Sequence, residues 1–162
     1  MINPTTVQAW FADFVDKAVT MQEDKAKRLA YNYDDLKTGL QSRYPCLLPT
    51  IILEDPQGRP LWNGALHDQT NFGFWVMKRN KSQDFANENA VVNECDVVAR
   101  KIIAKMLHEY ENDLDTVMRF LNPANISYEK AGPAINDLFG VYYSYSLELG
   151  DGYEYDALDY VE

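Results

Sequence analysis

The sequence has no hydrophobic run long enough to cross a bilayer, because none of its apolar stretches reaches the roughly 18 residues that a membrane-spanning helix needs. It begins without a basic segment followed by an apolar one, so we expect no secretory signal and synthesis in a cytoplasm. The two cysteines, Cys46 and Cys95, form no CxxC pair and are too few for a zinc site of their own. We expect both to be buried thiols.

The residue patterns of common catalytic sites are also missing. The only two histidines, His67 and His108, each neighbour a carboxylate, but neither stands in an HExxH motif. The sequence contains no glycine-rich phosphate loop and no serine in a nucleophile-elbow pattern. We therefore predict a protein that is not an enzyme, with no catalytic residue, metal ligand or cofactor. An enzyme that uses His67 or His108 is a weaker hypothesis.

The charge is unevenly distributed. The chain carries 25 acidic and 15 basic residues, a net charge of −10. Residues 147–162 contain six of the acids and none of the bases, so six of the ten excess negative charges lie in this last segment. A negative surface repels phosphate, which argues against sequence-specific binding of nucleic acid.

The hydrophobic content of 46% is enough for one folded domain in a chain of 162 residues. We expect a single α+β domain over residues 1–149 and an acidic, tyrosine-rich tail over residues 150–162. Apolar residues at spacings of three and four predict an N-terminal helix over residues 4–30 and a long helix over residues 88–121. A short helix is expected over residues 34–41.

Strands are predicted between these helices. Residues 47–53 are rich in β-branched side chains, and residues 72–77 and 139–147 combine aromatic residues with a period of two. Residues 125–129 form a shorter candidate, and the proline- and glycine-rich residues 55–60 indicate a turn. Together these elements predict a small antiparallel or mixed sheet of about four strands, with the long helix and the N-terminal helix packed on one face.

The aromatic strands and the charges beside them are the predicted contact surface for other proteins. Aromatic residues are common at interface hot spots, and opposite charges improve the rate and register of association. Lys78, Arg79 and Lys81 could meet an acidic partner, including the tail of a neighbouring copy. The predicted interface residues are Phe72, Phe74, Trp75, Lys78, Arg79, Lys81, Tyr142, Tyr143, Tyr145, Tyr153, Tyr155 and Tyr160.

The second half of the chain resembles a known family. The long helix at 90–104, a short strand, and the glycine-aromatic strand at 137–147 are similar to tail-terminator and tail-completion (neck) proteins of tailed bacteriophages. The entry into the first strand at 44–47 fits the same pattern. The resemblance covers roughly residues 44–148 and rests on the order of elements. The N-terminal helix and the acidic tail have no match in that pattern.

The resemblance implies a small subunit that forms a ring of identical copies, often sixfold, where the tail meets the head of the virion. There it would contact tail-tube and neck or connector proteins, after synthesis in the cytoplasm of the host bacterium. An alternative from the composition is a small acidic binding or inhibitor protein that docks its tail in a basic groove of its partner. Neither hypothesis involves a membrane.

Overall fold

The computed structural model describes residues 2–40, 42–62, 66–80, 84–134 and 137–149. The N-terminal helix α1 (Pro4–Lys17) starts where Asn3 accepts a hydrogen bond from the backbone of Thr5, and Pro4 occupies the first turn. It ends earlier than the predicted residue 30, because Ala18 is extended and two 3₁₀ turns follow, η1 (Val19–Met21) and η2 (Lys25–Lys27).

The sheet is built around a long strand. β4 (Leu66–Arg79) pairs on one side with β2 (Thr50–Leu53) and β3 (Gln57–Trp62), and on the other with β6 (Leu138–Leu149). The short strand β1 (Leu29–Ala30) runs parallel to β2, and β5 (Ser127–Ala131) runs antiparallel to β6. The described strands therefore form one mixed sheet in the order β1-β2-β4-β6-β5, with β3 beside the N-terminal half of β4.

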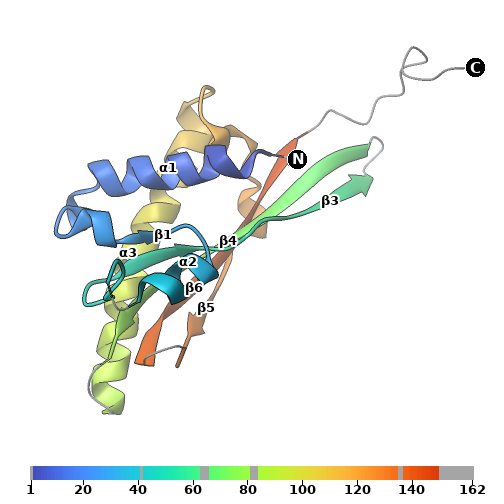
Figure 1. The fold of residues 1–162 in the computed structure, drawn as a ribbon. Helices are drawn as coiled ribbons and strands as arrows, with labels where there is room; N and C mark the ends of the chain where they lie inside the picture. The colour runs from blue at the N-terminus through green and yellow to red at the C-terminus, as the bar shows by residue number, and fades with distance from the viewer. Residues whose placement is uncertain (1, 41, 63–65, 81–83, 135–136, 150–162) are drawn as a thin grey trace, which may run out of the picture.

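The β3 strand contradicts the turn predicted at residues 55–60. Pro60 lies inside β3 and cannot donate a backbone hydrogen bond, but β3 pairs only with β4 in the described part of the chain. An edge strand tolerates proline, which explains why turn-forming residues can adopt this conformation. Figure 1 shows β3 and the start of β4 projecting away from the helices as a long ribbon.

The helices lie on both sides of the sheet. α3 (Phe85–Asn112) and α1 pack on one face, here called the inner face, as predicted. α3 stops at Asn112 rather than 121, and the 3₁₀ turns η3 (Val117–Phe120) and η4 (Pro123–Asn125) follow it. The small helix α2 (Tyr33–Gly39) lies in front of the sheet in Figure 1, on the opposite or outer face. The predicted α+β class is thus confirmed, with more strands than expected.

The two faces have separate hydrophobic clusters. The larger one joins α1, α3 and the inner side of the sheet, with Phe11, Phe74 and Ile102 almost fully buried. The smaller one lies under α2 and contains Leu36, Ile52 and other buried residues. Within the described residues, no helix is both long and apolar enough to span a membrane.

A candidate binding face on the outer side of the sheet

The period of two along β4 and β6 divides the predicted interface residues between the two faces. Phe72, Phe74, Tyr143 and Tyr145 point inward and are buried, with exposed fractions of 4%, 0%, 4% and 2%. Stacked rings join Phe72 to Tyr145 and Phe74 to Tyr143, with centroids 5.6 and 5.7 Å apart. The prediction that these four residues contact other proteins is therefore wrong, because α1 and α3 already cover them.

Tyr143 is held further by a polar contact with α3. Its hydroxyl donates a hydrogen bond of 2.8 Å to the carboxylate of Asp96. Burial, and then this hydrogen bond, raise the pKa of Tyr143 well above that of an exposed tyrosine. The inner aromatic side chains thus stabilise the fold of this chain itself.

Trp75 and Tyr142 point to the outer face and remain partly exposed. They are cross-strand neighbours, with ring centroids 5.0 Å apart. The Tyr142 hydroxyl donates a 2.5 Å hydrogen bond to Glu54, and burial together with this bond raises the pKa of Tyr142. Gly73 makes the contact possible, because a Cβ at that position would collide with both the Glu54 carboxylate and the Tyr142 hydroxyl.

An apolar pocket lies beside this pair, at the edge of α2. It has a volume of about 120 Å³. Its walls come from α2, β2, β4, β6 and the end of β5 with the segment after it, and are formed by Tyr33, Leu36, Ile52, Trp75, Met77, Ala131, Gly132, Ala134 and Leu138. A cavity of about 150 Å³ accepts benzene, so this pocket is close to the size of one aromatic or branched side chain. We call the pocket and the Trp75–Tyr142 pair the outer aromatic face.

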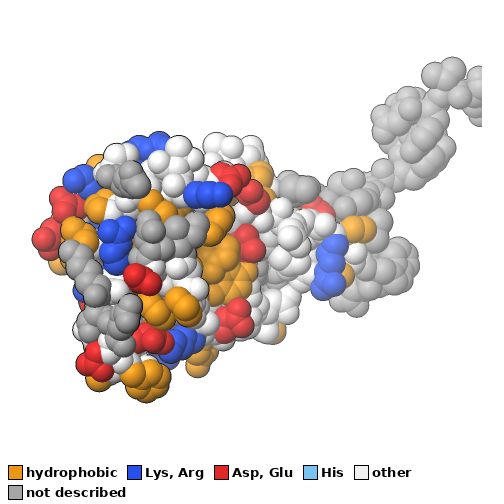
Figure 2. All heavy atoms as spheres, turned by 60° about the horizontal axis from the view of Figure 1, so that its bottom comes forward, with side chains coloured by type: hydrophobic (Ala, Val, Ile, Leu, Met, Phe, Trp, Pro, Cys, Tyr) orange, Lys and Arg blue, Asp and Glu red, His pale blue; other side chains and the backbone are white. Residues whose placement is uncertain are grey.

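Figure 2 shows hydrophobic side chains gathered near the middle of the molecular surface, with basic and acidic groups around them. Two basic residues are neighbours of residues that line the pocket. Arg79 is the cross-strand partner of Leu138, and Lys37 lies one helical turn from Tyr33. In the described part of the chain, neither makes an ion pair with a carboxylate.

The other predicted basic residues differ from Arg79. Lys78 points to the inner side, where its ammonium group lies 2.7 Å from the Glu94 carboxylate of α3, so it belongs to an ion pair within the chain. Lys81 lies outside the described residues, and so do Tyr153, Tyr155 and Tyr160. For these four positions, the predicted contacts stay predictions.

The two histidines do not meet. His67 lies on the projecting part of β4, 3.9 Å from Glu148, whereas His108 lies on the last turns of α3 beside Asn112. The described residues contain no group of three or more histidine, cysteine or acidic side chains that could hold a metal ion. Both cysteines are buried thiols, and burial raises the pKa of Cys95 to about 12, which keeps it protonated and unreactive near neutral pH.

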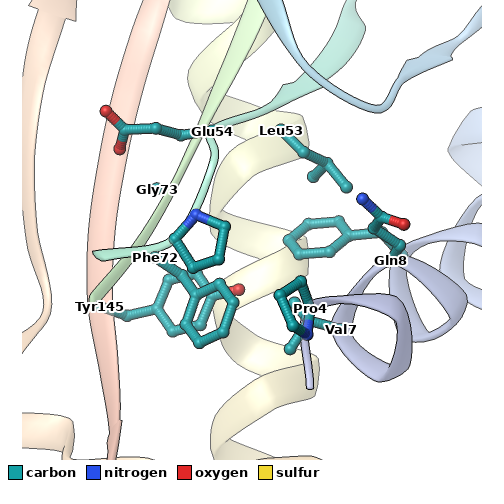
Figure 3. Close-up of a pocket in the computed structure, with 10 residues that line it drawn as sticks. Pro4, Val7, Gln8, Leu53, Glu54, Phe72, Gly73 and Tyr145 are labelled. Carbon is teal, nitrogen blue, oxygen red and sulfur yellow. The ribbon is translucent and has the colours of Figure 1, made fainter. Parts of the chain in front are cut away.

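A second, smaller cavity lies between α1 and the sheet. In Figure 3, Tyr145 of β6 points toward α1, near Pro4 and Val7. The cavity has a volume of about 10 Å³, which is room for roughly one water molecule. The Tyr145 hydroxyl is buried with no hydrogen-bond partner among the described residues, and burial raises its pKa. This cavity is too small to hold a substrate.

Comparison of the chain with family models, with curated proteins and with solved structures gave no match. The sequence indicated Trp75 and Tyr142, but it gave no sign of the pocket, whose walls come from five separate segments.

Proposed function

We propose that the chain is a structural subunit that assembles head to tail with copies of itself into a ring, as a tail-terminator or neck protein of a phage or phage-like particle. The observation that carries this proposal is the outer aromatic face, where a partly exposed Trp75–Tyr142 pair adjoins an apolar pocket. Aromatic anchors beside a pocket are typical of protein–protein hot spots.

The position of this face supports assembly by unlike surfaces. The pocket lies near the end of the sheet where β4 finishes and β6 begins, at Met77 and Leu138. The projecting ribbon of β3 and β4 and the end of β6 at Leu149 lie at the opposite end. The sheet is about 43 Å long, since a strand rises about 3.3 Å per residue. Contacts between two different ends generate a ring where the rotation closes and a filament where it does not.

The projecting ribbon itself has one strand edge that no described strand covers. β3 pairs with β4 alone, and this edge is available to another chain. Its proline, Pro60, limits continuous pairing with another strand, which is a common protection against uncontrolled growth of a sheet. The ribbon is therefore suited to a limited contact with a neighbouring subunit or with a tail-tube protein.

Native mass spectrometry and negative-stain electron microscopy of the full chain test this proposal. We expect a closed oligomer whose population rises with protein concentration. Trp75→Arg places a charge in the outer aromatic face, and it should raise the concentration needed for assembly by about tenfold or more. Val19→Arg is the matched control, because Val19 is a hydrophobic residue with 89% of its surface exposed that lies away from this face.

Two results would contradict the proposal. One is a chain that stays monomeric at high concentration, both alone and with tail-tube or connector proteins. The other is an oligomer that responds equally to Trp75→Arg and Val19→Arg. Circular dichroism of each variant must first establish that the fold is retained, since Trp75 lies in the central strand β4.

A further inference from the structure

We infer that the pocket of the outer aromatic face binds the tyrosine-rich tail, residues 150–162, of a neighbouring copy. This inference rests on the proposed head-to-tail assembly and names the segment that makes the contact. The tail contains Tyr153, Tyr155 and Tyr160 together with five acidic residues and no basic ones.

The chemistry of the two surfaces is complementary. The pocket is apolar and close to the size of one aromatic ring, and Trp75 and Tyr33 provide aromatic walls on which a tyrosine can stack. Arg79 is the cross-strand partner of Leu138 and Lys37 lies one helical turn from Tyr33, and neither forms an ion pair among the described residues. Glu54 and Glu129 also lie on this face, at Tyr142. A segment that carries tyrosines therefore supplies the ring that this pocket lacks, and its acids can pair with Arg79 and Lys37.

The length of the tail decides which copy it reaches. β6 ends at Leu149, which pairs with Asp68, and Trp75 and Met77 lie seven and nine residues further along β4. At about 3.3 Å per residue, the pocket is roughly 23–30 Å from Leu149. A fully extended chain covers about 3.3–3.6 Å per residue, so Tyr153 and Tyr155 reach only about 14 and 21 Å, whereas Tyr160 reaches about 37 Å.

β6 runs away from the pocket, so a tail that folds back must first reverse its direction. Tyr153 therefore falls short of the pocket of its own chain and the ring of Tyr155 reaches at most its nearer edge, whereas both can enter the pocket of a neighbour whose sheet follows head to tail. They alternate with Glu154 and Asp156, so in an extended segment both tyrosines lie on one side. We assign the contact to these two tyrosines. Tyr160 is the residue that would act if the tail folded back on its own chain.

The first arm of the test changes the tail of the full chain. The double variant Tyr153→Ser and Tyr155→Ser should raise the concentration needed for assembly by about tenfold or more, measured by native mass spectrometry. Tyr160→Ser is the matched control and should change it by less than about threefold. The inference is overturned where the double variant assembles like the wild type, or where Tyr160→Ser alone has the large effect.

The second arm changes the pocket. Tyr33→Ala removes one wall, and Tyr31→Ala is its control, because the two tyrosines are 46% and 43% exposed and only Tyr33 lines the pocket. A synthetic peptide of residues 150–162 is titrated into full chain that carries the double serine tail, and binding is followed by tryptophan fluorescence and calorimetry. Tyr33→Ala should weaken peptide binding by about tenfold. Equal binding to the Tyr33→Ala and Tyr31→Ala chains would overturn the inference.

The two arms also separate this inference from the proposed function. If the variant with the double serine tail forms the ring as well as the wild type, the tail contact is contradicted and the proposed ring is not. If the wild-type chain stays monomeric, the proposed ring is contradicted, and the peptide titration then tests only whether the pocket binds the tail. In that case, binding that depends on Tyr33 supports the site, and absence of binding overturns it.

Discussion

The two faces of the sheet carry matching aromatic pairs in different surroundings. Phe74 and Tyr143 are cross-strand partners on the inner face, and Trp75 and Tyr142 are the next pair along, on the outer face. The hydroxyl of each tyrosine donates a hydrogen bond to a carboxylate, that of Tyr143 to Asp96 and that of Tyr142 to Glu54. The inner pair is closed off by two long helices, whereas the outer pair has only the short α2 beside it.

Because of this difference, we expect the inner pair to act mainly in the stability of the fold and the outer pair mainly in contacts with other proteins. Aromatic side chains buried by the chain itself contribute to the free energy of unfolding. Aromatic side chains left partly exposed next to a pocket can still lose contact with water when a second protein covers them. Equivalent positions on adjacent residues of one strand should therefore respond to mutation in different ways.

Truncation of the inner pair should have the largest effect. Phe74→Ala removes a side chain that is completely buried, so we expect a loss of about 3–5 kcal/mol in the free energy of unfolding. Trp75→Ala should cost less, about 1–2 kcal/mol, because its ring is partly exposed. Urea unfolding at low protein concentration measures both values. Equal losses would mean that the outer face is a core in its own right.

Raising the pH should have the next largest effect, and it should act through both faces. Burial raises the pKa of Tyr44 and of Cys95 to about 12, from 10.0 and 9.0, and the pKa values of Tyr142 and Tyr143 are raised as well. Between pH 9 and 12 the unfolded chain releases these protons while the folded chain keeps them.

The stability that these groups contribute is therefore fully present below pH 9 and is lost as the pH rises toward 12. Urea midpoints measured from pH 8 upward, together with the ultraviolet absorbance of tyrosinate, check this sign. A midpoint that rises or stays constant across the window would contradict it.

The two buried inner tyrosines should differ when the hydroxyl alone is removed. Tyr143→Phe loses the hydrogen bond to Asp96 and should cost about 1 kcal/mol. Tyr145→Phe removes a buried hydroxyl without a partner among the described residues, so the free energy of unfolding should stay within about 0.5 kcal/mol of the wild type or increase. A loss for Tyr145→Phe as large as that for Tyr143→Phe would show that the hydroxyl is well satisfied.

Much of the fold could be predicted from local patterns. The period of two already placed Phe72 and Phe74 on one face of the strand and Trp75 on the other. The sequence could not reveal which face the helices would cover, because α2, α1 and α3 come from distant parts of the chain. For that reason the sequence predicts an interface role for inner and outer aromatic residues alike, although only the outer pair remains partly exposed.

Long-range contacts also explain the errors at element boundaries. The spacing of apolar residues predicts an N-terminal helix that continues to residue 30. In the structure, the guanidinium group of Arg28 is buried and donates hydrogen bonds to the backbone oxygens of Thr20, Glu23 and Pro49. These bonds hold the two 3₁₀ turns against β2 in place of more helix. The proline and glycine residues at 55–60 predict a turn, and the strand β3 is possible there because an edge strand tolerates Pro60.

Oxidative footprinting of the full chain, dilute and then concentrated enough to assemble, tests the central claim most directly. Trp75 and Tyr142 should be oxidised readily in the dilute chain and become protected on assembly, while the already buried Phe74 and Tyr143 react slowly in both samples. Unchanged oxidation of Trp75 and Tyr142 in the concentrated sample would contradict the claim that other subunits cover the outer aromatic face.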